Sequence, residues 1–76
     1  MSYIRNDKAL KAVGLLIRKL REKKGYSQQK FADECDMDLS QINRIELGKV
    51  NTSVSIIFKL AEVLEIKPSK LLDVKI

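Results

Sequence analysis

The segment from Tyr26 to Gly48 constrains the fold more than any other part of the chain. Ser27 precedes an apolar stripe that includes Phe31 and Cys35, four residues apart, which is the spacing of one helix face. The Ser27 hydroxyl can accept a backbone N–H of the first turn, so it is expected to cap a helix of about two turns. The turn-forming residues 36–38 then end this helix.

A second short helix is predicted from Leu39 to Leu47, after the turn. Ile42 and Ile45 recur at helical spacing within it, and Gly48 ends it because glycine readily takes a positive φ. Asp38 is expected to cap its first turn. The segment therefore predicts two short helices joined by a tight turn. The small side chain of Ala32 on the first helix would let the second helix cross close over it.

The outward face of the second helix carries an unusual set of polar side chains. Surface helices commonly expose Lys and Glu, whereas this one exposes Ser40, Gln41, Asn43 and Arg44. Such side chains donate and accept hydrogen bonds at base edges, and Arg can bind guanine through two hydrogen bonds. Taken alone, the pattern fits an ordinary solvated face equally well.

Composition is consistent with a small basic helical domain. The 76 residues suffice for one domain, and 45% of them are hydrophobic without any Trp, which indicates an aliphatic core. The chain has 15 Lys and Arg against 10 Asp and Glu, a formal net charge of +5. This balance favours a polyanionic partner, although it also suits any small basic protein.

Several functional classes are disfavoured by what the chain lacks. It has no His and a single Cys, so a zinc site and an internal disulfide are excluded. Cys35 is expected to be a small buried hydrophobe rather than a reactive thiol. No paired acidic residues suggest a catalytic pocket, so we expect neither enzyme activity nor a cofactor. No apolar run reaches membrane-spanning length and the N-terminus lacks a secretory signal, which predicts a cytoplasmic protein.

A long helix is expected before the central segment. Asp7 is the expected cap of this helix. The helix should run to about Lys24, with a buried stripe formed by Leu10, Val13, Ile17 and Leu20. Gly14 lies inside this stripe. An interior glycine costs about 1 kcal/mol relative to Ala, so either another helix packs closely there or the regular helix starts later. Residues 1–6 have no clear period and are expected to form a flexible arm.

Two further helices are predicted after Gly48. Thr52 or Ser53 should cap a helix from Val54 to Leu64, and Pro68 suits the first turn of a last short helix that ends near Leu72 or Asp73. The apolar residues near the chain end exceed what closing a small core requires. Some should complete the core and the others could form a dimer interface, and the candidates are Leu71, Leu72, Val74 and Ile76.

Three stretches of the chain resemble the lambdoid phage repressor and Cro family, also called the XRE family. They are IRKLREKKGYSQQKFAD from Ile17, INRIELGK from Ile42 and IIFKLAEVLEIKPSKLLD from Ile56. The resemblance covers residues 15–72. It implies an all-α, compact five-helix domain of the lambda-repressor type containing a helix-turn-helix, with the whole chain as one domain and residues 15–73 as its core.

The resemblance also implies a function and a set of site residues. The expected function is a sequence-specific regulator of transcription that binds double-stranded DNA as a homodimer on a near-palindromic operator. Residues 39–47 would be its recognition helix, with base readers at Leu39, Ser40, Gln41, Asn43 and Arg44. The expected phosphate ligands are Gln28, Lys49, Asn51 and Ser53, because helix N-termini and small hydroxyl groups beside Lys and Asn bind phosphate well, although each loop residue alone fits an ordinary turn or cap equally well. The structural ion pair that the resemblance implies joins Arg21 to Glu46.

The chain departs from the family pattern at two positions. Asp36 stands where the family often has Gly, and Asp tolerates left-handed backbone angles at modest cost. Leu39 stands where relatives often place a polar base reader, so it would either read a base or only contact a thymine methyl group. The alternative function is a protein-interaction module, such as an antitoxin that binds a partner protein through the last helices.

Overall fold

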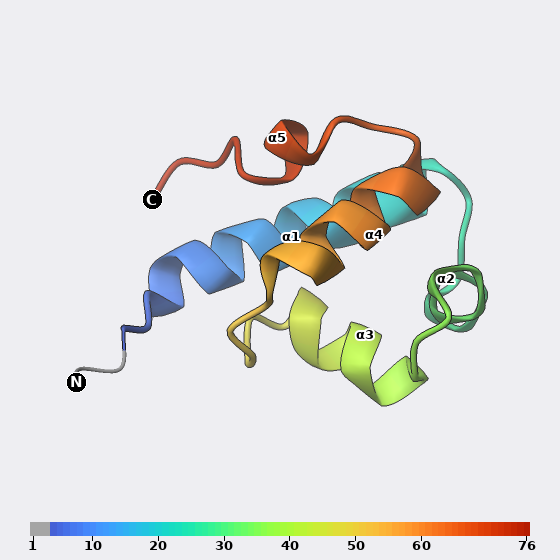
Figure 1. Ribbon diagram of the computed structural model, residues 1–76, viewed down its shortest axis with the longest axis horizontal. Helices are drawn as coiled ribbons and strands as arrows, with labels where there is room; N and C mark the ends of the chain where they lie inside the picture. The colour runs from blue at the N-terminus through green and yellow to red at the C-terminus, as the bar shows by residue number, and fades with distance from the viewer. Residues whose placement is uncertain (1–3) are drawn as a thin grey trace.

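The computed structural model describes residues 4–76 and contains five α-helices in that part of the chain. They are α1 (Asp7–Lys23), α2 (Gln28–Cys35), α3 (Leu39–Glu46), α4 (Val54–Leu64) and α5 (Pro68–Leu71). Figure 1 shows the long α1 across the middle of the molecule, with α3 on one side of it and α5 on the other. This all-α architecture confirms the predicted fold class.

The helix boundaries follow from local capping interactions. Ser27 Oγ accepts the N–H of Lys30, and Ser53 Oγ accepts the N–H of Ile56, as predicted for the starts of α2 and α4. Pro68 occupies the first turn of α5. At the end of α2, Asp36 takes left-handed backbone angles with φ of 55°, a conformation that Asp tolerates better than most residues.

Two predicted caps differ from the structure. Asn6, not Asp7, is the N-cap of α1, because its Oδ1 accepts the N–H of Ala9 at 3.0 Å. Asp7 is instead the first helical residue and pairs with Arg5. Asp38 does occupy the N-cap position of α3, but its side chain makes no capping hydrogen bond.

The N-terminal arm predicted over residues 1–6 lies partly outside the described residues, because the description begins at residue 4. Residues 4–6 are not helical, and Ile4 and Arg5 hydrogen-bond to the loop between α3 and α4. Asn51 Nδ2 donates to the Ile4 carbonyl, and Arg5 Nη2 donates to the Lys49 carbonyl. This part of the chain is therefore tethered to the domain.

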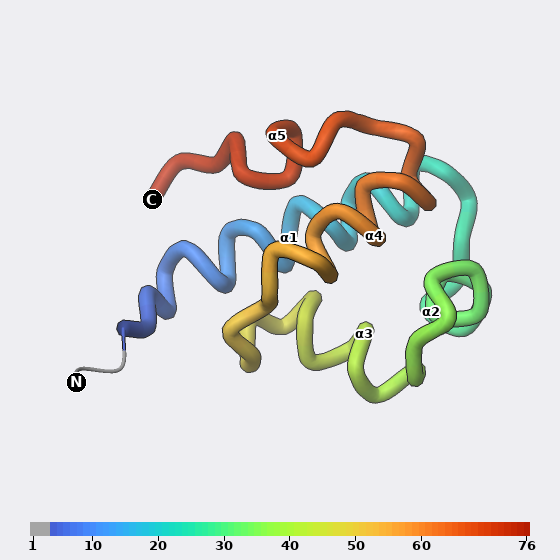
Figure 2. The backbone as a smooth tube through the Cα atoms, in the orientation of Figure 1, coloured from blue at the N-terminus to red at the C-terminus, as the bar shows by residue number. Residues whose placement is uncertain are grey.

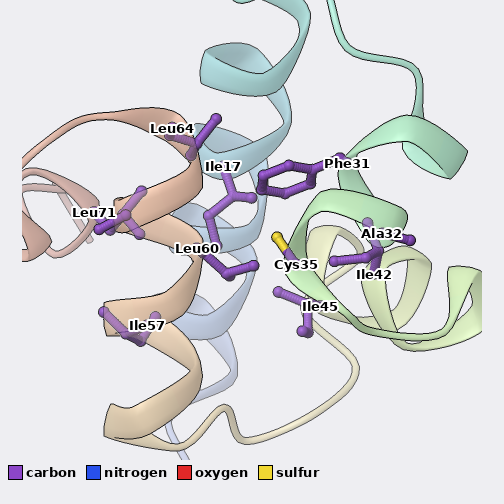
Figure 3. Close-up of a cluster of buried hydrophobic side chains, with 11 residues drawn as sticks. Ile17, Phe31, Ala32, Cys35, Ile42, Ile45, Ile57, Leu60, Leu64 and Leu71 are labelled. Carbon is purple, nitrogen blue, oxygen red and sulfur yellow. The ribbon is translucent and has the colours of Figure 1, made fainter.

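The core gathers side chains from all five helices, and Figure 3 shows it between α1, α2 and α4. Its largest fully buried side chains are Phe31, Ile17, Ile42, Leu60 and Leu71. The Figure 2 trace shows α2 end-on, so that its axis crosses those of α1 and α4, and α3 below these two helices. The two helices of the predicted pair pack against each other, and Ala32 is fully buried.

Gly14 marks a close approach between α1 and α3. A Cβ atom there would lie 2.5 Å from the Ile45 carbonyl oxygen and 2.6 Å from that of Glu46. The interior glycine is therefore explained by another helix packing closely against α1, and not by a later start of the helix. The absent side chain lets the end of α3 rest directly on α1.

Candidate nucleic-acid interface

The α3 helix has one face in the core and one toward solvent. Ile42, Ile45 and Glu46 are buried, while Ser40, Asn43 and Arg44 are exposed and Gln41 is half-buried. Leu39, at the start of the helix, is 42% exposed. All five predicted base readers are thus accessible to some degree on one short helix.

The orientation of α3 is fixed by a buried ion pair between Arg21 of α1 and Glu46. Arg21 Nε donates to Glu46 Oε2 at 2.7 Å and Nη2 donates to Oε1 at 3.0 Å, a two-point contact. Arg21 Nη1 also donates to the Tyr26 carbonyl at 2.8 Å. The hydrogen bond to Glu46 raises the pKa of Arg21 further, although burial opposes this rise. The implied ion pair is therefore present, and it holds α3 against α1.

Gln28, the first residue of α2, is bound to α3. Its Nε2 donates to Glu46 Oε1 at 3.0 Å and to Asn43 Oδ1 at 3.4 Å. Both amide hydrogens are thus engaged, and a phosphate contact through the side chain would displace one of these partners. The backbone N–H of Gln28 belongs to a first helical turn, whose amides lack partners within the helix and point outward.

The other predicted phosphate ligands lie on the loop between α3 and α4. Lys49 and Asn51 are exposed, and Ser53 is exposed at the N-terminus of α4. Gly48 turns the chain with φ of 71°, and a Cβ there would lie 2.7 Å from Lys11 Cα. The loop therefore follows directly from the recognition-type helix and packs against the start of α1.

Arg5 was not among the predicted site residues, yet it touches this loop through the Lys49 carbonyl at 2.9 Å. The two residues are 44 positions apart in the chain. No local pattern of residues signals such a contact, because it depends on how α1 and α3 pack.

The predicted dimer residues divide into buried and exposed members. Leu71 is 0% exposed because it closes the core between α1 and α4, so its assignment to a dimer interface was wrong. Leu72 is 61% exposed and Ile76 is 69% exposed, while Val74 is half-buried.

Two exposed apolar residues of α4 extend the surface around Leu72. Val54 is 73% exposed and Phe58 is 58% exposed. Both line a groove of about 360 Å³ together with Leu72, and the remaining lining residues are Thr52, Ile57, Pro68 and Ser69. We call this the α4–α5 face. Sequence reasoning missed Val54 and Phe58 because their spacing of four resembles an ordinary core stripe.

Cys35 lies in the core at 2% exposure, as expected for a small buried hydrophobe. Burial raises the pKa of its thiol to about 11, which keeps the thiol protonated at neutral pH. Within residues 4–76 there is no cluster of three or more His, Cys, Asp or Glu that could hold a metal ion. None of the helices described is long and apolar enough to cross a membrane.

Comparison with known proteins gives consistent matches. The helix-turn-helix family model matches residues 17–71. Control protein C.BamHI of Bacillus amyloliquefaciens is 39% identical over 61 residues, covering 79% of this chain and 75% of that protein.

Two solved structures support the same likeness. The restriction-modification controller protein C.AhdI from Aeromonas hydrophila has a TM-score of 0.79 at 39% identity, over 82% of this chain and 94% of that one. SinR, a master regulator for biofilm formation solved in complex with DNA, has a TM-score of 0.75 at 31% identity, over 80% of this chain and 98% of that one.

Proposed function

Because the chain belongs to the helix-turn-helix family, we propose that it is a transcriptional regulator that binds double-stranded DNA sequence-specifically through α3. The single observation that carries this proposal is the two-sided α3 helix. Its inner face is held by the core and by the Arg21–Glu46 ion pair, and its outer face presents polar side chains. A rigidly mounted helix of this kind can enter a major groove in one orientation.

The outer face of α3 offers a chemically distinct set of contacts. Arg44 can bind the O6 and N7 atoms of guanine, and Asn43 or Gln41 can bind adenine. Leu39 is exposed enough to pack on a thymine methyl group, and Ser40 can donate or accept. We assign base reading to these five side chains.

Phosphate contacts are assigned to groups that flank α3. These are the α2 N-terminus at Gln28 and the residues Lys49, Asn51 and Ser53 of the following loop and cap. With a net charge of +5, the chain should release counterions on binding, so affinity should fall steeply with salt. Such contacts set orientation on the duplex and carry little sequence preference.

A homodimer completes the proposal, with the α4–α5 face as the contact between copies. A two-fold contact requires a surface that is complementary to itself, and this face places the projecting Phe58 beside an apolar groove. Figure 1 shows α5 and α3 on opposite sides of α1, so pairing through α5 would leave both α3 helices uncovered. Two copies of α3 about 34 Å apart would then read a near-palindromic operator.

The process controlled is proposed from the relatives. C.BamHI is described as a control protein and C.AhdI as a restriction-modification controller, each 39% identical to this chain. We therefore propose that this chain controls transcription of restriction-modification genes.

The deciding experiment is selection of bound sites from a random duplex pool at physiological salt, combined with the mass of the protein in solution. A palindromic consensus bound by a dimer is the expected result. If no sequence is enriched above the salt-sensitive background, the proposal fails, and binding of a partner protein becomes the function to test.

Two substitutions then separate base reading from phosphate binding. Arg44→Ala should flatten the preference at one base pair by about 1–3 kcal/mol, whereas Lys49→Ala, at an exposed position of the loop, should weaken binding to all sequences alike. Affinity for the selected site and for single-base variants measures both. Equal losses on every sequence for Arg44→Ala would remove Arg44 from the base readers.

A further inference from the structure

We propose that Arg5 is a positioning residue for DNA binding, which acts by fixing the loop that carries Lys49 and Asn51. The proposal rests on the proposed function, since it concerns how the phosphate ligands are presented. Arg5 lies outside residues 17–71, the part of the chain that the family model matches. The N-terminal segment would therefore add a brace to the domain.

The Arg5 guanidinium joins the start of α1 to the loop. Its Nε donates to Asp7 Oδ1 at 2.6 Å, and its Nη2 donates to the Lys49 carbonyl at 2.9 Å. The planar guanidinium presents these donors in a fixed arrangement. Asp7 is the first residue of α1, so the guanidinium is oriented by a helical residue while it holds the loop.

The backbone N–H and the backbone carbonyl of Lys49 both have hydrogen-bond partners. Its N–H donates to the Arg44 carbonyl at 2.9 Å, and its carbonyl accepts from Arg5. The peptide groups on either side of the Lys49 Cα are therefore held, which sets the direction in which the Cα–Cβ bond of the exposed Lys49 leaves the backbone. Since Arg44 belongs to α3, the orientation of Lys49 is set relative to the recognition helix.

Two neighbouring contacts hold the same loop. Asn51 Nδ2 donates to the Ile4 carbonyl at 3.3 Å, and Gly48 lies against the backbone of Lys11. The loop is thus attached to the N-terminal segment at Lys49 and Asn51 and rests on α1 at Gly48. Removing the Arg5 side chain takes away the charged donor that binds the Lys49 carbonyl and leaves the neutral donor of Asn51.

The first test compares Arg5→Ala with Arg18→Ala, a matched loss of one arginine from an exposed position of α1. Ordering one long side chain costs about 0.5–1.5 kcal/mol on binding, so Arg5→Ala should weaken DNA affinity by about twofold to tenfold more than Arg18→Ala. The loss should be equal on specific and random duplexes, because phosphate contacts carry no sequence information. Equal affinities for the two variants would overturn the proposal.

The second test asks whether Arg5 acts through the loop or contacts phosphate itself. If it acts through Lys49, the effect of Arg5→Ala should largely vanish in a Lys49→Ala background, whereas independent phosphate contacts would give additive losses. Arg5→Lys keeps the positive charge but lacks the planar guanidinium, so its DNA affinity should stay as low as that of Arg5→Ala. Additive losses, or full affinity with Arg5→Lys, would show a charge contact and contradict positioning.

A measurement on the free protein keeps this proposal separate from the proposed function. Backbone ¹⁵N order parameters of residues 49–51 should fall in Arg5→Ala and stay unchanged in Arg18→Ala, with both variants folded by circular dichroism. Unchanged order in Arg5→Ala would overturn the brace even if DNA binding is intact. A wild-type chain that binds no duplex would instead defeat the proposed function, and the role of Arg5 in DNA binding with it.

Discussion

Arg21 illustrates how one buried side chain can decide the presentation of a whole surface. Its side chain is 8% exposed, and its guanidinium contacts Glu46 and the Tyr26 carbonyl, so it joins α1 to the end of α3 and to the residue before the α2 cap. Removing charges from water is costly, and a buried ion pair adds little net stability. Its main contribution here is the fixed orientation of α3.

Arg21→Met should destabilise the domain by about 3–5 kcal/mol, because Glu46 would remain buried without its cationic partner. Urea unfolding followed by circular dichroism measures this change. Arg18→Met is the matched control, since Arg18 is exposed and its ion pair on the same helix, with Glu22 at 3.5 Å, is exposed too. This variant should change stability by less than about 0.5 kcal/mol. The double variant Arg21→Met with Glu46→Leu should recover part of the loss. Similar losses for Arg21→Met and its control would contradict the structural role.

Glu65 gives a residue-level prediction for pH dependence. The Lys24 ammonium donates a hydrogen bond to Glu65 at 2.6 Å and lowers the pKa of that carboxyl below its ordinary value of 4.5. Since the folded pKa is depressed, the stability from this contact is present above pH 4.5 and is lost as the pH falls through the folded pKa. Lys24→Met should return the Glu65 pKa to its ordinary value, as followed by NMR titration of the carboxyl carbon. Lys23→Met, an exposed neighbour on α1, should leave it unchanged.

At the scale of helices, Gly14 sets the contact between α1 and α3. Elsewhere in a helix, replacing glycine by alanine stabilises by about 0.8–1 kcal/mol. Here the new methyl group would overlap two backbone carbonyls of α3, which cannot move as a side chain would. Gly14→Ala should therefore destabilise by about 1–3 kcal/mol, measured by thermal or urea unfolding.

The same variant should also weaken DNA binding, because separating α1 from α3 disturbs the Arg21–Glu46 ion pair. Lys19→Ala, at an exposed position of the same helix, controls for helix propensity and should be nearly neutral. A stabilised Gly14→Ala variant would show that the two helices can move apart at no cost.

The helices themselves could be predicted because their signals are local. Ser27 and Ser53 cap their helices as expected, and Pro68 begins α5. Contacts between distant residues could not be predicted in the same way. Whether Leu71 or Leu72 enters the core depends on how α5 sits on α1 and α4, and adjacent apolar residues give no pattern that separates them.

The candidate site was partly predictable for the same reason. Residues of α3 alternate between core and solvent with a helical period, so the sequence identified the outward set that includes Ser40 and Arg44. The engagement of Gln28 with Glu46 and the contact of Arg5 with Lys49 depend on packing between helices. Neither leaves a local signal in the chain.

At the scale of the whole molecule, the proposed homodimer makes the α4–α5 face the surface that would let two copies of α3 act together. A small chain with a polar DNA-reading surface gains little from exposing Val54, Phe58 and Leu72 around one groove unless another surface covers them. In the proposed homodimer, pairing through this face would convert two weak half-site contacts into one bivalent interaction, in which the second contact is intramolecular. Dimerisation and operator affinity should therefore be lost together.

Phe58→Glu tests this coupling, because it places a carboxylate at the centre of the proposed contact. Sedimentation equilibrium should show a monomer where the wild-type chain is a dimer, since a buried unpaired charge opposes association. Leu15→Glu is the matched control: Leu15 is 49% exposed on α1, and the substitution changes the net charge equally. On a palindromic site the Phe58→Glu variant should lose affinity, while on an isolated half-site it should match Leu15→Glu. Equal losses on both sites would mean that the variant damages the domain itself, and an unchanged dimer would place the interface elsewhere on the molecule.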